Sequence, residues 1–126
     1  MIILNFSHPL TGAQLETLQV QTGQMAFDLR EIKIHFDSEQ SFTDQTRALV
    51  ESLNIDSKTW QTEPILINPP AFNAIALALL AELNGRMGYF PAIIRLKPIP
   101  GSTPPRFAFA EIINLQAIRE QARSQR

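Results

Sequence analysis

The stretch that decides how this chain folds is Pro64-Ile-Leu-Ile-Asn-Pro-Pro70. Its first half is fully apolar, which is typical of a strand buried on both faces of a parallel sheet. The two prolines end that strand, and prolines are favoured just before a helix or at its first position. Residues 71–83 then predict a helix. The side chains expected on its inner side are Phe72, Ile75, Leu79, Leu80 and Leu83.

Related patterns flank this unit on both sides. We expect further strands at residues 2–6, 31–36, 92–96 and 107–115. Residues 31–36 alternate cleanly between polar and apolar, which predicts a half-exposed strand near an edge. Helices are expected after a cap at Thr11, after a cap at Ser41 or Thr43, and over residues 116–126, with a turn or short helix in residues 55–63.

Strands that alternate with helices predict an α/β fold with a mostly parallel sheet covered on both faces. Residues 98–105, with four prolines, are too short for a helical crossover. The last strand is therefore expected to be antiparallel. The sequence predicts one Rossmann-like, three-layer domain over residues 1–126.

The amino-acid composition excludes several kinds of functional site. The 126 residues contain no cysteine, which excludes a disulfide framework, a thiolate metal site and a cysteine nucleophile, and fits a reducing cytosol. The two histidines, His8 and His35, lack the spacing of a metal site. We see neither a leader sequence nor an apolar stretch long enough for a bilayer, so a cytoplasmic protein is expected.

Charge is unevenly distributed along the chain. Residues 1–85 carry a net charge of −6 and residues 86–126 a net charge of +5, with six arginines to one lysine in the basic part. Arginine suits bidentate phosphate contacts, but a salt-bridged surface with a solvated last helix explains the pattern equally well. The total of −1 disfavours a general binder of DNA or RNA.

Polar loops follow three of the expected strands, at residues 5–11, 68–73 and 98–106. Parallel sheets bind ligands outside the carboxyl ends of their strands, where we expect these loops to meet. Two of them lead into helix N-termini, which favour anions. The loops predict a site for an anionic ligand, such as a nucleotide or oligonucleotide. The candidate ligand-binding residues are Asn5, Ser7, His8, Thr11, Asn68, Pro69, Asn73, Arg95, Ser102, Thr103 and Arg106.

Each candidate also has an ordinary structural explanation. Asn5 and Asn68 can satisfy the backbone of a turn, and Ser7 can cap one. His8 is either a turn residue or a group for base stacking or proton transfer. Arg95 lies within an apolar strand, where its charge needs a partner. His35 is expected on the surface.

Several familiar nucleotide sites are missing from the sequence. There is no G-x-G-x-x-G and no Walker sequence, so ordinary dinucleotide and P-loop binding lose support. No pair of acids stands in a candidate loop. Ser7 and His8 are chain neighbours, which does not make a catalytic triad.

Five short motifs are distributed along the whole chain. They are Asn5-Phe-Ser-His-Pro-Leu-Thr11, Asn68-Pro-Pro70, Phe90-Pro-Ala-Ile-Ile-Arg-Leu96, Pro100-Gly-Ser-Thr-Pro-Pro-Arg106 and Ile113-Asn-Leu-Gln-Ala-Ile-Arg119. In this order they resemble the fifteenth family of the CRISPR-associated Csx series, a group of accessory proteins of type III CRISPR systems. The resemblance covers essentially the whole chain. It implies a CARF-like domain that acts as a symmetric homodimer, which can form a higher assembly on ligand binding.

The resemblance implies that the dimer holds cyclic tetra-adenylate, the messenger of these systems, without a cofactor or metal. The implied role is to lower the free messenger, either by sequestering it or by cutting it as a metal-independent ring nuclease. Ser7 and His8 are the catalytic candidates if the ring is cut. The lack of an acid–base pair favours sequestration. A third alternative is an interaction module that binds a partner through its last helix, where Leu115 and Ile118 lie beside Arg119 and Arg123. Simple packing of this helix on the sheet is the explanation that we favour for these residues.

Overall fold

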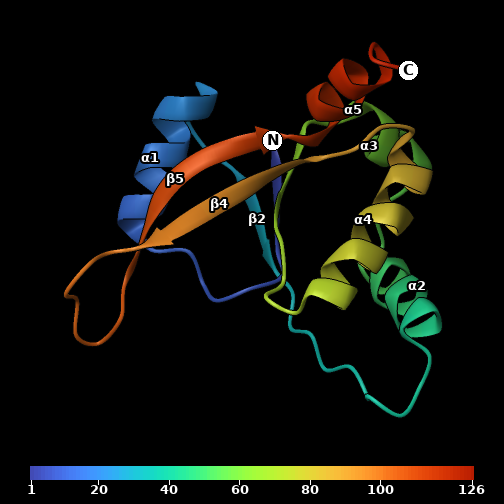
Figure 1. Cartoon of the computed structure of the whole chain (residues 1–126), viewed down its shortest axis with the longest axis horizontal. Coiled ribbons are helices and arrows are strands. Elements are labelled where there is room, and N and C mark those ends of the chain that lie inside the picture. The colour runs from blue at the N-terminus through green and yellow to red at the C-terminus, as the bar shows by residue number, and fades with distance from the viewer.

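A five-stranded mixed sheet forms the middle layer of the protein (Figure 1). The structure, a computed structural model, describes residues 1–126. The strands lie in the order β2-β1-β3-β4-β5. All neighbours are parallel except β4 and β5, so the predicted α/β fold and antiparallel last strand are confirmed. The strands are β1 (Ile2–Asn5), β2 (Asp28–Glu31), β3 (Ile65–Asn68), β4 (Ala92–Pro98) and β5 (Phe107–Asn114).

Helices cover both faces of this sheet. In Figure 1, α1 lies on one side of the strands, and α2, α3 and α4 lie on the other. The arrangement is a Rossmann-like three-layer fold, as the alternation of strands and helices predicts. The helices are α1 (Gly12–Thr22), α2 (Phe42–Ser52), α3 (Ser57–Thr62), α4 (Asn73–Met87) and α5 (Leu115–Arg123).

Two hydrophobic cores lie on opposite faces of the sheet. Alternate residues of β1 point to opposite faces, so Leu4 packs with Val50 and Leu79 in one core, while Ile3 packs with Leu18 in the other. All four residues of β1 and all four of β3 are buried. Burial on both faces explains why these two strands read as continuous apolar runs.

Side-chain caps fix where the first two long helices begin. Thr11 caps α1 through a capping box with Gln14, and Gly23, with φ of 71°, ends the helix. Ser41, rather than Thr43, caps α2, because its hydroxyl accepts a hydrogen bond from the Asp44 N–H at 3.2 Å.

The edge strand differs from its prediction. The sequence predicts a strand over residues 31–36, but β2 covers Asp28–Glu31, and residues 32–36 continue beyond it without a ladder. The physical reason is the length of β1. β1 ends at Asn5 and the chain bends at Ser7 and His8, so residues beyond Ile32 have no strand beside them.

The inner side of α4 also needs one correction. Ile75, Leu79 and Leu83 are buried as predicted, but Phe72 is 57% exposed. Phe72 precedes the helix as its N-cap residue, so it does not follow the helical stripe.

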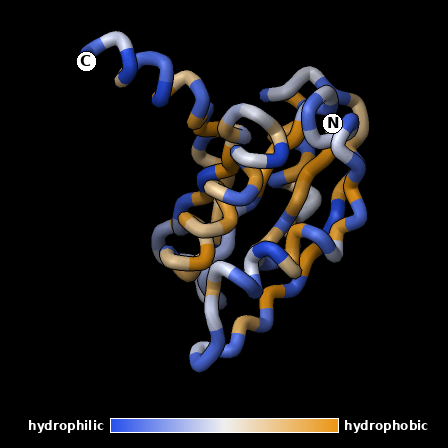
Figure 2. Tube along the Cα trace, turned by 90° about the vertical axis from the view of Figure 1, so that its right-hand side faces the viewer, coloured by the Kyte–Doolittle hydropathy of each residue, from blue (hydrophilic) through white to orange (hydrophobic).

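The C-terminal part of the chain is the most exposed. Arg95 of β4 pairs with Glu111 of β5 at 2.7 Å, which supplies the partner that its charge needs. No residue of α5 is buried, and Figure 2 shows this helix standing away from the rest of the chain. None of the five helices has the length and hydropathy that crossing a bilayer requires.

Candidate functional site

The strand order reverses between β1 and β3. From β1 the chain passes through α1 to β2 on one side, and from β3 it passes through α4 to β4 on the other. The two loops that leave these neighbouring strands therefore diverge and open a crevice at their carboxyl ends. In open α/β sheets, this switch point is where ligands bind.

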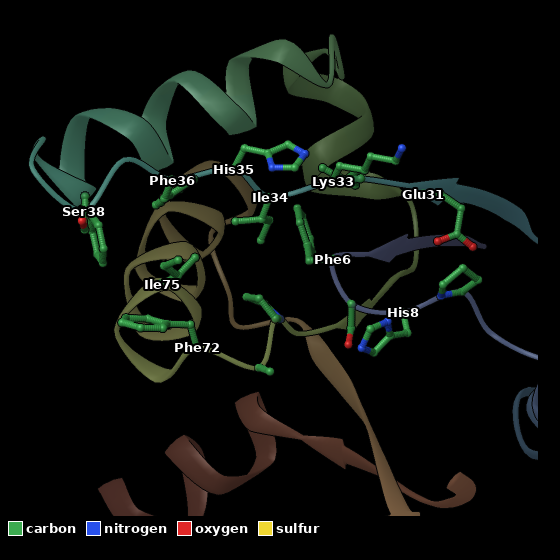
Figure 3. Close-up of a pocket in the computed structure, with 16 residues that line it drawn as sticks. Phe6, His8, Glu31, Lys33, Ile34, His35, Phe36, Ser38, Phe72 and Ile75 are labelled. Carbon is green, nitrogen blue, oxygen red and sulfur yellow. The ribbon is translucent and has the colours of Figure 1, made fainter. Parts of the chain in front are cut away.

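A cleft of about 790 Å³ opens at this switch point. One wall is the loop that follows β1, with Ser7 and His8, and another is the start of α4, with Phe72 and Ile75. The third wall is the segment 31–38, which runs past the end of β2 (Figure 3). The volume lies in the range of small-molecule sites.

The Asn5 side chain connects two of these walls, the loop after β1 and the segment 31–38, through hydrogen bonds. Its Nδ2 donates to the His8 carbonyl at 2.9 Å and to the Glu31 carboxylate at 2.7 Å. Its Oδ1 accepts from the Ser7 N–H at 3.0 Å and from Asn68 Nδ2 at 2.9 Å. Asn5 is fully buried and Asn68 nearly so. The two amides hold the turn backbone, which is one of the two roles that the sequence left open, and neither of them lines the cleft.

Ser7 and His8 are the two predicted residues whose side chains line the cleft. Asn5 fixes their backbone, whereas neither the Ser7 hydroxyl nor the His8 imidazole is hydrogen-bonded within the protein. Figure 3 shows the His8 ring on the opposite side of Phe6 from His35. Both side chains are therefore available to a ligand.

The two helix N-termini at this edge differ in what they offer. The Thr11 hydroxyl accepts from the Gln14 N–H at 3.2 Å and the Gln14 side chain accepts from the Thr11 N–H at 2.8 Å, so the start of α1 is closed. The start of α4 has no side-chain cap. Asn73 begins α4 three residues after the cleft residue Pro70, and neither Asn73 nor Pro69 lines the cleft. The first-turn N–H groups of α4 have no side-chain partner and are free for an anion.

Aromatic side chains gather at one end of the cleft, which the sequence did not predict. Phe36 and Phe42 meet edge to face with ring centroids 5.5 Å apart, and Phe42 and Phe72 do so at 5.9 Å. All three line the cleft, and the exposed ring of Phe72 offers a stacking surface. They come from three segments distant in sequence, so only the fold brings them together.

Polar side chains of the segment 31–38 also line the cleft. Glu31, Lys33 and His35 are exposed and belong to its lining. His35 is on the surface, as predicted, but it borders the cleft as well. The alternating pattern of residues 31–36 predicts an extended segment, but the sequence does not show that this segment lies beside the loop after β1.

The third predicted loop does not join the site. Gln14 Nε2 donates to the Phe107 carbonyl at 2.8 Å, which fastens the loop end of the β4–β5 hairpin to α1. Figure 1 shows the loop of this hairpin projecting beyond α1. Ser102, Thr103 and Arg106 thus lie outside the cleft lining, as does Arg95. The long, two-stranded hairpin carries its loop past the shorter strands of the switch point.

No group of three or more metal-ligating side chains occurs in the structure. Comparison of the chain with protein-family models, curated proteins and solved structures gives no match.

Proposed function

We propose that this chain binds cyclic tetra-adenylate and lowers its free concentration by holding it. The observation that carries the proposal is the cleft at the β1–β3 switch point, where an uncapped helix start and an exposed aromatic ring lie together. This combination suits a ligand with both phosphates and flat bases. The resemblance of five motifs to the fifteenth Csx family favours the cyclic messenger over other nucleotides.

Two kinds of contact are proposed for this ligand. The free N–H groups at the start of α4 and the Ser7 hydroxyl bind phosphate oxygens. The exposed rings of Phe72 and His8 stack on adenines, because base stacking on such rings is favourable and needs no charge. No metal takes part, which suits a polar site without a carboxylate cluster.

A ring of four nucleotides is larger than the molecules that a cleft of about 790 Å³ encloses. Each chain is therefore proposed to hold part of the ring, with a second copy holding the symmetry-related part. A ring with repeating symmetry matches a two-fold assembly of identical sites. The cytoplasm is the proposed location, because a chain without cysteine suits a reducing compartment.

Holding is favoured over cutting. Ring opening without metal uses a ribose 2′-hydroxyl to attack the adjacent phosphorus, and a base and an acid placed on opposite sides of that phosphate accelerate it. His8 is the only histidine on the loop after β1, and one oxygen of the Glu31 carboxylate accepts from Asn5. The second candidate function is a ring nuclease, which the unpaired Ser7 and His8 side chains in the same cleft favour.

The stacking contact can be tested with two matched phenylalanine variants. Phe72 and Phe107 are 57% and 48% exposed, and only Phe72 lines the cleft. Phe72→Ala is expected to weaken binding of labelled cyclic tetra-adenylate about tenfold or more, since a stacked base contributes about 1–3 kcal/mol. Phe107→Ala should leave the affinity unchanged. Equal affinities in all three proteins would contradict the proposed site.

A further inference from the structure

The sheet ends at β2 with an open edge. β2 is hydrogen-bonded to β1 on one side and to no strand on the other. Beyond it, no main-chain N–H of residues 33–36 is hydrogen-bonded within the protein. The exposure of the side chains keeps alternating through this segment, with Glu31, Lys33 and His35 exposed and the residues between them half-buried. The edge is therefore an extended strand that lacks a neighbour.

The direction of its main-chain groups follows from the bonds to β1. The N–H groups of Asp28 and Ile32 donate to the carbonyls of Met1 and Asn5, at 3.0 and 2.8 Å. Even-numbered residues thus direct their main-chain groups toward β1. In an extended chain the odd-numbered residues direct theirs the other way, toward the open edge. Such a row of free groups is a template for another strand.

The charges on this edge are self-complementary in one antiparallel register. When Ile32 lies opposite Ile32 of a second copy, Glu31 lies opposite Lys33 of that copy, and the reverse pair forms as well. Moving the register by two residue positions in either direction places Glu31 opposite Glu31 or Lys33 opposite Lys33. Opposite charges directly across a ladder stabilise it, and like charges destabilise it. The register with Ile32 on the axis is therefore favoured.

We propose that the edge formed by residues 29–35 pairs antiparallel with the same edge of a second copy of this chain, around a two-fold axis at Ile32. A lysine on an edge strand normally discourages pairing. Here each Lys33 meets a Glu31, so the lysine disfavours other strands and other registers while it supports this one. One oxygen of Glu31 accepts from Asn5, and its second oxygen is free for Lys33 of the second copy.

This interface does not depend on which ligand the cleft binds. It does affect the cleft, because residues 31–36 form one of its walls. Pairing supplies hydrogen-bond partners to that wall and fixes its position. The dimer and the cleft are thus joined by one segment, and the experiments below are done without ligand, so that their outcome is separate from ring binding.

Cross-linking tests the register directly, because the chain has no cysteine of its own. Across the axis the two copies of residue 32 form a non-hydrogen-bonded pair with Cα atoms about 4.5 Å apart. This distance permits a disulfide. Ile32→Cys is expected to give a covalent dimer under mild oxidation. Ile34→Cys is the matched control, equally half-buried. In this register the two copies of residue 34 are roughly 13 Å apart along the strands and should not cross-link.

Sedimentation equilibrium of charge variants tests the pairing without a cross-link. Lys33→Glu places two pairs of like charges across the axis and should weaken the dimer about tenfold. Glu31→Lys should do the same, and the double variant Glu31→Lys with Lys33→Glu should recover most of the affinity. Lys97→Glu, a reversal on exposed β4, is the control and should have no effect. Circular dichroism checks that each variant is folded.

Preferential cross-linking of the Ile32→Cys variant and rescue by the double charge variant would support the proposal. A wild-type chain that stays monomeric at every concentration would overturn it. So would a dimer that is insensitive to the charge at residue 33. Efficient cross-linking of the Ile34→Cys variant would overturn the register.

Discussion

Asn5 shows how one buried amide organises a site that it does not line. Its side chain makes four hydrogen bonds, to the loop after β1, to β2 and to β3. A polar side chain at the end of a buried strand could be recognised in the sequence. Which of its two roles it takes could not, because the partners lie up to 63 positions away in the chain.

Removing that amide should destabilise the whole protein. Asn5→Ala leaves the Asn68 amide and the Ser7 N–H without their acceptor, and unpaired buried groups cost about 1–3 kcal/mol. We expect the free energy of unfolding to fall by about 2 kcal/mol, measured by urea denaturation. Asn73→Ala, at an exposed position, should change it by less than about 0.5 kcal/mol. Equal effects would show that the buried network does not support the fold.

Thr46 is a buried residue whose hydroxyl has no hydrogen-bond partner. Thr46→Val keeps the shape of the side chain and removes the unsatisfied group. The free energy of unfolding should therefore rise by about 1 kcal/mol. Thr43→Val, at an exposed position of the same helix, controls for helix propensity and should have little effect. A loss of stability in Thr46→Val would mean that the hydroxyl has a partner in solution.

The residues at which helices and strands begin and end depend on the neighbouring elements in the fold as much as on the hydrophobic pattern of the sequence. Thr11 begins α1 as the sequence predicts, and Gly23 ends the helix, because capping is local. The strand predicted over residues 31–36 was misplaced, because alternation shows an extended chain and not where its partner ends. Phe72 was placed inward for a similar reason, since the first residues of a pattern are not yet in the helix.

The cap of α3 gives the protein one pH-dependent element. The Asp56 carboxylate accepts hydrogen bonds from the side chain of Thr59 and from the Thr59 N–H, the latter at 2.7 Å, and these bonds lower the pKa of Asp56. A lowered folded pKa means that this contribution to stability is complete above the unfolded pKa of about 3.9 and is lost as the pH falls through the folded value.

Asp56→Asn keeps a capping side chain that does not titrate. The difference in melting temperature between the wild type and this variant should therefore favour the wild type at pH 6 and shrink as the pH falls below 4. Thermal unfolding followed by circular dichroism measures it. A difference in melting temperature that stays constant down to the lowest pH would contradict the stabilising role of the Asp56 carboxylate at the start of α3.

The last helix separates the proposed function from that of an interaction module. Ile118 is 56% exposed on α5, away from the cleft. Ile118→Glu should change neither ring affinity nor, beyond about 0.5 kcal/mol, the free energy of unfolding. Isothermal titration calorimetry measures the ring affinity, and urea denaturation measures the free energy of unfolding. A loss of ring binding would place the ligand or its dimer at α5 instead.

At the scale of the whole molecule, the sequence predicts the layers better than the site. Apolar strands alternating with helices are sufficient for the three-layer fold and the antiparallel β5. Two of the three predicted loops flank the cleft, at Ser7–His8 and at Pro70. The third was wrong because the length and attachment of the β4–β5 hairpin depend on tertiary contacts, such as Gln14 with Phe107. The phenylalanines at the cleft were missed for the same reason.

Sequestration and cutting can be distinguished by following one labelled ring. Purified protein is mixed with cyclic tetra-adenylate in excess chelator, native gels record binding, and chromatography records the fate of the ring over hours. We expect a tight complex from which intact ring is recovered, and His8→Ala should alter affinity alone. Linear products ending in a 2′,3′-cyclic phosphate would contradict sequestration and make the protein a ring nuclease. The absence of any complex would contradict the proposed ligand itself.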